Sequence, residues 1–100
     1  MSSDAGLHDA DGRRVAEYRI TVKPSAAKEF DELAPTIASR IEAKIAALSS
    51  NPRPPGVKKL KGALDLWRIR AGDWRVIYAI DDRKRAVDIV RIRHRSKAYE

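Results

Sequence analysis

The chain has no cysteine among its 100 residues, only six aromatic residues in 100, and just two histidines. The absence of cysteine excludes disulfides and thiolate zinc sites, and it favours the reducing cytoplasm as the compartment. No apolar run approaches the roughly 20 residues that cross a bilayer, and the N-terminus lacks the apolar core of a signal peptide. Two histidines far apart, at positions 8 and 94, do not predict a metal site. We therefore expect a cytoplasmic protein without membrane contacts, metal or cofactor.

Positive charge is abundant but unevenly placed. The net charge is +7, yet residues 1–52 carry 7 Lys/Arg against 8 Asp/Glu, whereas residues 53–100 carry 14 against 6. A charge spread for solubility alone would not collect in one half of the chain. A localised basic patch indicates a phosphate-rich partner.

The N-terminal half predicts an arm, a strand and two helices. Residues 1–15 are polar and aperiodic, which is typical of a disordered arm, and residues 16–100 form the predicted domain. Alternation over Ala16–Val22 predicts a strand that ends at Pro24. Helical spacing follows, and Pro35 divides it into two helices that form an antiparallel hairpin. The apolar stripe of the second helix comprises Ile37, Ile41, Ile45 and Leu48.

The C-terminal half predicts a meander of three strands, over Asp65–Arg70, Trp74–Ile80 and Ala86–Ile92. A two-residue loop at Gly72 and Asp73 would pair the first two strands. In the last strand, two sets of side chains alternate between the two faces. One set is Val87, Ile89, Arg91 and Arg93, and the other is Asp88, Val90, Ile92 and His94. The predicted class is α+β: an N-terminal strand, a two-helix hairpin and a mainly antiparallel strand meander.

Counting from the predicted loop sets the faces of the first hairpin. Arg70 then lies opposite Arg75, and Trp67 lies opposite Tyr78. One face, expected to be buried against the helices, carries Trp67, Ile69, Val76 and Tyr78. The other face carries Arg68, Arg70, Arg75 and Ile77, and we expect its arginines to be exposed. Directly opposed like charges destabilise a sheet, so the Arg70–Arg75 pair points to function rather than to folding.

Four segments together resemble the RelE/ParE superfamily of bacterial and archaeal toxins. They are K-K-L-K-G (58–62), L-W-R-I-R-A-G-D-W-R-V-I-Y (66–78), the turn at Asp81 and Asp82, and the ending R-I-R-H-R-S-K-A-Y (91–99). The ending is similar to that of the RelE branch. The resemblance extends from about Tyr18 to Tyr99 and implies the strand–helix hairpin–meander fold.

What the resemblance implies is the toxin of a type II toxin–antitoxin pair. Toxins of the RelE branch bind the ribosomal A site and cleave mRNA there without a metal, by attack of a 2′-hydroxyl on the adjacent phosphate. The implied partners are a cognate antitoxin, the ribosome and mRNA. The family positions that match are Arg68, Arg70, Arg75, Tyr99 and one tail arginine, either Arg93 or Arg95.

Such an attack needs positive charge on the phosphorane, a base for the hydroxyl and help for the leaving oxygen. The arginines can supply the charge; because arginine stays protonated, proton transfer is not their task. His94 titrates near neutrality and lies in the basic segment, so it is a candidate acid or base, although a surface contact to RNA is as good an account. Tyr99, with an ordinary pKa near ~10, needs cationic neighbours to act as a base; stacking is its alternative role. The predicted catalytic set is thus Arg68, Arg70, Arg75, His94, Arg95 and Tyr99.

Further cations are predicted to bind the RNA backbone as point charges: Lys58, Lys59, Lys61, Arg91, Arg93 and Lys97. Two other functions fit a toxin of this superfamily. One is a ParE-like inhibitor of DNA gyrase, which binds rather than cleaves. The other is a catalytically degenerate homologue that binds only its antitoxin or RNA.

Overall fold

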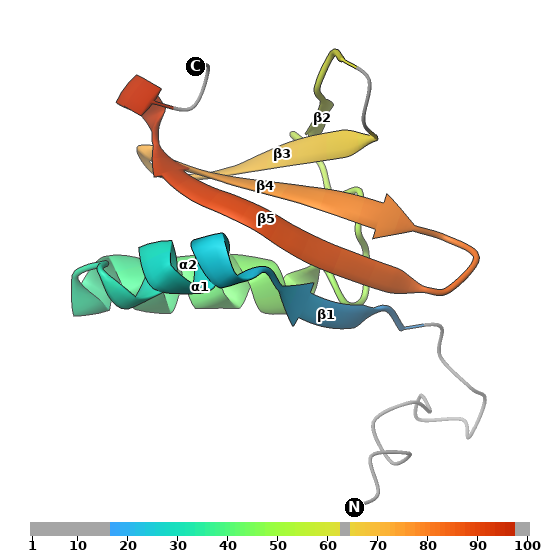
Figure 1. The fold of residues 1–100 in the computed structure, drawn as a ribbon, viewed down its shortest axis with the longest axis horizontal. Coiled ribbons are helices and arrows are strands. Elements are labelled where there is room, and N and C mark those ends of the chain that lie inside the picture. Colours follow the sequence, from blue (N-terminus) through green and yellow to red (C-terminus); the bar gives the residue numbers. More distant parts are fainter. Residues whose placement is uncertain (1–16, 63–64, 98–100) are drawn as a thin grey trace, which may run out of the picture.

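A computed structural model of the chain describes residues 17–62 and 65–97. They form a five-stranded sheet in the order β1-β5-β4-β3-β2, with α1 and α2 lying together on one of its faces (Figure 1). The predicted α+β class and the order of its main elements are confirmed. The predicted arm over residues 1–15 and the C-terminal Tyr99 lie outside the described residues.

The N-terminal strand β1, Arg19–Val22, is shorter than predicted and pairs in parallel with the start of β5, from Arg19 opposite Ala86 to Val22 opposite Ile89. Helix α1, Pro24–Asp31, follows at once, and Pro24 occupies its first turn. Proline suits this position because its missing N–H would have no partner inside the helix. The strand therefore ends where the sequence predicts.

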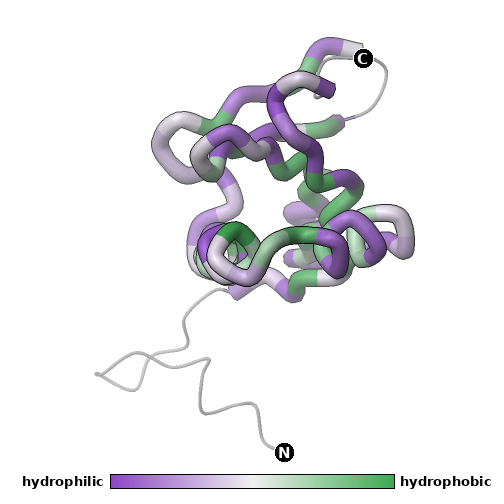
Figure 2. Tube along the Cα trace, turned by 90° about the vertical axis from the view of Figure 1, so that its left-hand side faces the viewer, coloured by the Kyte–Doolittle hydropathy of each residue, from purple (hydrophilic) through white to green (hydrophobic). Residues whose placement is uncertain are grey.

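The helix hairpin is also confirmed. Helix α2, Pro35–Ala47, again begins with a proline. Figure 1 shows the two helices running in opposite directions, and Figure 2 shows them side by side beneath the sheet with their connection facing the viewer. Ile41 and Leu48 of the predicted stripe are fully buried, and Ile37 and Ile45 pack against the same core.

The hairpin of β3, Leu66–Ala71, and β4, Trp74–Asp81, has the predicted two-residue loop. Gly72 is the first loop residue and has a φ of +63°, a conformation that glycine adopts without steric cost. Because the loop length fixes the register, the counted pairs are observed, from Ala71 opposite Trp74 to Trp67 opposite Tyr78.

The last long strand, β5, Ala86–His94, extends two residues beyond the prediction and contains an irregularity. Ile77 of β4 pairs with Arg91, but Tyr78 pairs with Ile89, so Val90 is an extra residue on β5. Such a bulge reverses the side to which the following residues point. The simple alternation predicted for this strand is therefore wrong after Ile89: Ile92 joins Ile89 in the core, whereas Arg91 and Arg93 face the opposite side.

A further strand was not predicted. Residues Lys58–Lys59 form β2, which pairs antiparallel with β3, Lys58 opposite Arg68 and Lys59 opposite Trp67. Two lysines carry no strand signal of their own. Pairing with the edge of β3 creates this strand.

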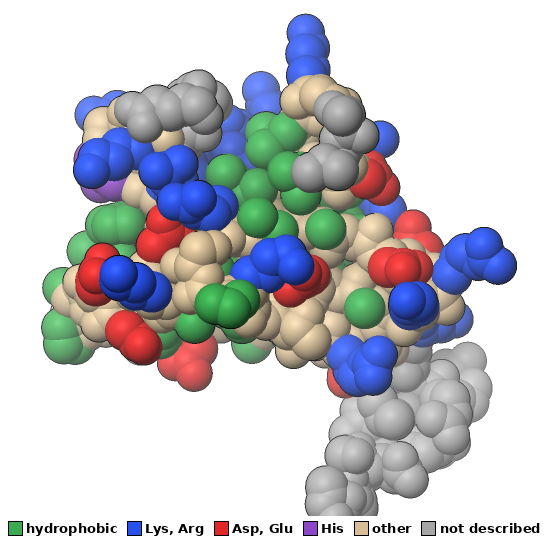
Figure 3. Space-filling view, in the orientation of Figure 1, with side chains coloured by type: hydrophobic (Ala, Val, Ile, Leu, Met, Phe, Trp, Pro, Cys, Tyr) green, Lys and Arg blue, Asp and Glu red, His purple; other side chains and the backbone are tan. Residues whose placement is uncertain are grey.

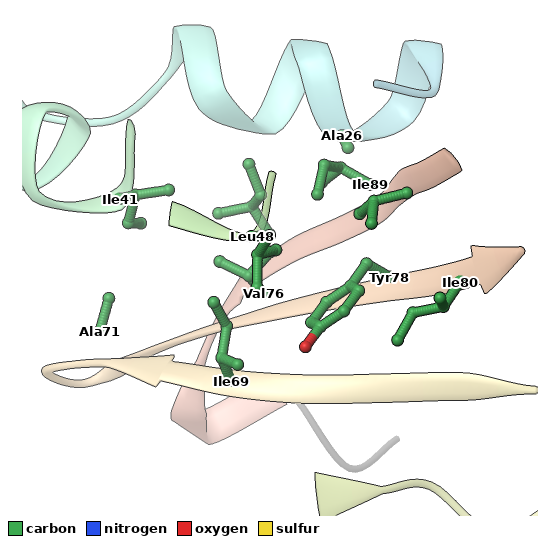
Figure 4. Packing of buried hydrophobic residues seen from close by; sticks show 11 residues of the cluster. Ala26, Ile41, Leu48, Ile69, Ala71, Val76, Tyr78, Ile80 and Ile89 are labelled. Carbon is green, nitrogen blue, oxygen red and sulfur yellow. The ribbon is translucent and has the colours of Figure 1, made fainter. Parts of the chain in front are cut away.

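The core lies between the helices and one face of the sheet (Figure 4). Ile69, Val76 and Tyr78 of the predicted buried face are at most 4% exposed, and Trp67 is partly buried beside them. The Tyr78 hydroxyl donates a hydrogen bond of 2.6 Å to the Pro52 carbonyl, and burial raises the pKa of this phenol to about 12. Within the described residues, no helix is both long and apolar enough to span a bilayer.

Candidate nucleic-acid interface

Three arginines form a row across three neighbouring strands on the face of the sheet away from the helices. Arg75 of β4 lies opposite Arg70 of β3 on one side and opposite Arg93 of β5 on the other. Residues that are directly opposite point to the same face, so the three arginine side chains leave the sheet on the same side. The next row continues the pattern with Arg68, Ile77 and Arg91. Counting along the sequence predicted the Arg70–Arg75 pair. The bulge in β5 then places Arg93 opposite Arg75 and Arg91 opposite Ile77, on the same face.

The exposure predicted for this face is only partly right. Arg70 is exposed, but Arg68 is 5% exposed and Arg75 is 7% exposed. Arg75 lies in the central strand between two long arginine side chains, and its Nη1 donates to the Gly72 and Trp74 carbonyls, at 3.2 Å each. Arg68 is covered because β2 pairs beside it. The Nε atom of each of these two guanidinium groups is itself buried.

Arg91 and Arg93 share a carboxylate. Glu29 of α1 accepts hydrogen bonds from Arg91 Nε and Nη2, at 3.2 and 2.9 Å, and from the Ile92 backbone N–H at 2.8 Å. Its distance to Arg93 Nε is 4.0 Å. Beyond Ile89, β5 has no strand partner on this side, because β1 ends at Val22. Glu29 therefore occupies a free sheet edge and neutralises part of the charge predicted to bind RNA.

A cavity of about 520 Å³ opens beside the arginine row. Its walls are the last turns of α2, the segment 54–56 before β2, Lys58 of β2, and residues 68–70 of β3. Three predicted site residues line it, Lys58, Arg68 and Arg70. Lys44 of α2 also lines it, and the sequence analysis missed this residue because a lysine off the apolar stripe is ordinarily a solvated one.

His94 does not join the arginine row. It pairs with Trp74, and the two rings meet edge to face with centroids 5.4 Å apart, on the side where Trp74 packs against the core. Its Nδ1 is 3.0 Å from the Ser96 hydroxyl. It lines a separate cavity of about 290 Å³ together with Glu29, Glu32 and Lys97. The structure thus places His94 and Arg75 on different faces of the sheet, although both belong to the predicted catalytic set.

The tail after β5 folds back to the hairpin tip. The 3₁₀ helix η2, Arg95–Lys97, begins with a hydrogen bond of 2.7 Å from the Arg95 N–H to the Asp73 carbonyl. The Arg95 side chain is exposed and lies 3.7 Å from the Asp73 carboxylate. In Figure 3, Lys and Arg side chains gather over the end of β5 and η2, at the upper left. The row and the tail are thus neighbours at one end of the sheet.

The remaining predicted lysines are dispersed. Lys59 forms an ion pair with Asp65 at 3.1 Å and lies 5.7 Å from the centre of the Trp67 ring, on the helix side of the sheet. Lys61 is exposed outside the strands. Neither residue lines the cavity beside the row.

At the opposite end of the sheet, Asp82 forms a network that the sequence analysis did not predict. It accepts two hydrogen bonds from Arg53, at 3.1 and 2.9 Å, and one of 2.7 Å from the Tyr18 hydroxyl. These bonds, from Arg53 first and then from Tyr18, lower the pKa of Asp82. The Arg53 guanidinium also lies 4.8 Å from the centre of the Trp67 ring. The network attaches the segment before β2 to the β4–β5 turn.

Comparison with known proteins decides the family. The profile of a family described as "ParE toxin of type II toxin-antitoxin system, parDE" matches residues 20–99. The chain is also 37% identical over 84 residues to "Toxin RelE" of Mycobacterium tuberculosis, which covers 82% of this chain and 86% of that protein. The chain belongs to the RelE/ParE family of type II toxins.

Solved structures agree on the RelE-like branch. The RelE–RelB complex of Pyrococcus horikoshii superimposes with a TM-score of 0.72 at 30% identity, covering 82% of this chain and 99% of that one. The intact RelBE toxin–antitoxin complex of E. coli gives a TM-score of 0.65 at 26% identity, covering 75% and 93%. The resemblance inferred from the four sequence segments is confirmed.

Proposed function

We propose that this RelE-like toxin is an endoribonuclease that cleaves mRNA on the ribosome. The observation that carries the proposal is the row of Arg70, Arg75 and Arg93 on one open sheet face. Three opposed cations destabilise the isolated sheet, and a phosphorane with its extra negative charge is the partner that offsets this cost.

The proposed reaction is a transesterification within the RNA. The 2′-oxygen forms a bond to the adjacent phosphorus while the bond from phosphorus to the 5′-oxygen breaks. The 2′-hydroxyl proton passes to a base, and the leaving 5′-oxygen takes up a proton. The products are a 2′,3′-cyclic phosphate and a 5′-hydroxyl. The arginines stabilise the charge that develops on the phosphorane, a role that suits planar, permanently charged groups.

Between the two tail arginines, the register favours Arg93 for this task. Arg93 lies directly opposite Arg75, whereas the exposed Arg95 lies beside Asp73. Arg95 then serves to bind RNA or the ribosome. Arg68 contributes charge from the neighbouring row, next to Lys58.

For the proton transfers, we favour Tyr99 over His94. His94 packs on Trp74 on the other side of the sheet, and its Nδ1 is close to Ser96. Tyr99 follows η2 in the sequence, near several cations that would lower the pKa of its hydroxyl. A proton-transfer residue contributes about 10²–10⁴ in rate, so Tyr99→Phe and His94→Ala will differ by such a factor.

The partners follow from the same charges. Relatives of this chain were crystallised with the antitoxin RelB. We propose that a cognate antitoxin binds this chain and that its contacting segment is acidic, because residues 53–100 carry 14 Lys/Arg against 6 Asp/Glu. The ribosome as site of action places the toxin in the cytoplasm.

The test is cleavage of mRNA bound to ribosomes with an empty A site, compared with the same mRNA free in solution. We expect cleavage only on the ribosome, at the Mg²⁺ concentration that the ribosome itself requires, with cyclic-phosphate ends. An mRNA that stays intact in both conditions would reject the enzymatic function and leave the binding-only homologue.

A second function has one specific observation in its favour, since the matching family is described as ParE toxin. A ParE-like protein would inhibit DNA gyrase. Supercoiling by purified gyrase in the presence of the toxin decides this point, and we expect no inhibition.

A further inference from the structure

The cavity beside the arginine row has an unusual lining. Four cations contribute to it, Lys44, Lys58, Arg68 and Arg70, and no carboxylate is found among its described lining residues. Three other cavities of the molecule each include at least one carboxylate, such as Glu29, Asp82 or Glu42. The cavity is therefore a place where an anion would be attracted on electrostatic grounds.

The cations come from three separate elements. Lys44 belongs to α2, Lys58 to β2, and both arginines to β3. Segments that are distant in the sequence converge only in the folded protein, so the cluster does not follow from a local run of basic residues. Pairing of Lys58 with Arg68 fixes two members side by side.

The wall of the cavity formed by residues 54–56 is uncharged and limits the shape of the cavity. Pro54 and Pro55 have no N–H and a fixed φ, which makes this wall stiff. Gly56, with a φ of +88°, has nothing within 4 Å of the position where a side chain would begin, so the wall leaves open space toward a ligand. A site that is preformed in this way loses less conformational entropy when it binds.

The cavity is continuous with the arginine row through Arg70, which belongs to both. A strand of RNA whose cleaved phosphate lies on the row can therefore place a neighbouring phosphate in the cavity. We propose that the cavity is a second phosphate site for single-stranded RNA, and that Lys44 is one of the residues that bind the phosphate. The inference depends on the proposed function only in taking RNA as the ligand.

Lys44 has a simpler role that must be separated from this one. It lies in the last turn of α2, where a cation stabilises the helix dipole. Lys28 is an ideal control, because it is the basic residue in the last turn of α1, is exposed, and does not line the cavity. The variants Lys44→Ala and Lys28→Ala remove the same charge from equivalent helix positions.

The first measurement is a titration of the ¹⁵N-labelled toxin with inorganic phosphate, in which the amides of Gly56, Lys58 and Arg70 report the cavity. We expect saturable shifts in the unmutated chain and in Lys28→Ala, and about tenfold weaker binding in Lys44→Ala, since the phosphate loses one charged donor. Equal titration curves for the two variants, or no saturable shift at these amides, would overturn the proposal.

The second measurement uses a short single-stranded RNA with 2′-O-methyl groups at every position, which cannot be cleaved because no free 2′-hydroxyl remains. The slope of log affinity against log salt is expected to fall by about one in Lys44→Ala and less in Lys28→Ala. A slope unchanged by Lys44→Ala would reject RNA as the ligand of the cavity. Because neither measurement involves cleavage, loss of the proposed enzymatic function would be seen separately, in the ribosome assay.

Discussion

Charged side chains are arranged differently at the two ends of the sheet. At the end formed by the β4–β5 turn and β1, cations have carboxylate partners: Arg53 binds Asp82, and Lys23 lies 2.9 Å from Asp88. At the end formed by the β3–β4 hairpin, Arg70, Arg75 and Arg93 lie opposite one another. Paired charges at the first end support the fold, whereas opposed charges at the second end weaken it. The difference indicates that the second end is arranged for an anionic partner.

The largest effect is expected at Arg75. Replacing it with alanine removes the central cation of the row, and losing one charge-stabilising donor typically slows a reaction by ~10²–10³. The matched control is Arg83→Ala, which changes an exposed arginine in the β4–β5 turn. Single-turnover cleavage of ribosome-bound mRNA at saturating toxin measures both. Equal rates for Arg75→Ala and the unmutated chain would show that the row is not catalytic.

Glu29 contacts arginines near the end of the sheet formed by the β3–β4 hairpin, and we expect it to stabilise the fold. Glu29→Gln weakens the hydrogen bonds to Arg91 and the Ile92 N–H, and bonds to charged groups contribute ~1.5–3 kcal/mol. Because the Arg91 side chain is 38% exposed, we expect the low end of this range. Urea unfolding checks it, with the exposed Glu32→Gln as control. If both variants unfold at the same urea concentration, the Glu29 contacts contribute nothing to stability.

The hydrogen bond of the buried Tyr78 hydroxyl is expected to stabilise the core. At neutral pH, Tyr78→Phe should cost about 1 kcal/mol, because the Pro52 carbonyl loses its buried donor. The pKa of Tyr78 is raised from 10.0 to about 12, so its contribution is complete below pH 10 and is lost as the pH rises toward 12. The difference in unfolding free energy between the two proteins should therefore shrink over this interval. A difference that stays constant from pH 8 to 12 would contradict the burial of this phenol.

The smallest effect is expected at Asp82. Asp82→Asn removes an exposed ion pair with Arg53, and such pairs contribute little to stability because both charges stay hydrated. Since its pKa is lowered, this contribution is present at neutral pH and disappears in acid, below the ordinary value of 3.8. The melting temperature at pH 7 should fall slightly and cleavage should be unchanged. A loss of cleavage comparable to that of Arg75→Ala would remove the functional distinction between the two ends.

Much of the hairpin could be predicted from sequence because its determinants are local. A two-residue loop at Gly72 fixes which residues are opposite, so the Arg70–Arg75 pair follows by counting. The extra residue Val90 in β5 could not be counted in advance, because a bulge arises from how two strands fit together. Without it, Arg93 would point to the helices rather than lie opposite Arg75.

The candidate site could likewise be predicted only in part. Arg93, His94 and Arg95 are consecutive in the sequence, which does not specify where each side chain lies, and Arg93 and His94 line one cavity although they point to different faces of the sheet. The structure divides them among the row, the Trp74 side and the hairpin tip. Lys44 gave no signal in the sequence, because its position beside the cavity depends on how α2 packs near β3.

The sequence by itself determined the order of the main elements and the hairpin register, since prolines, turn residues and alternation act over a few neighbouring positions. Four sequence segments indicated the family. Only the tertiary structure decided which cations share a surface: the β5 bulge placed Arg93 opposite Arg75, the pairing of β2 covered Arg68, and the packing of α2 brought Lys44 to the cavity. These outcomes depend on contacts between residues far apart in the chain, and spacing along a sequence does not specify such contacts.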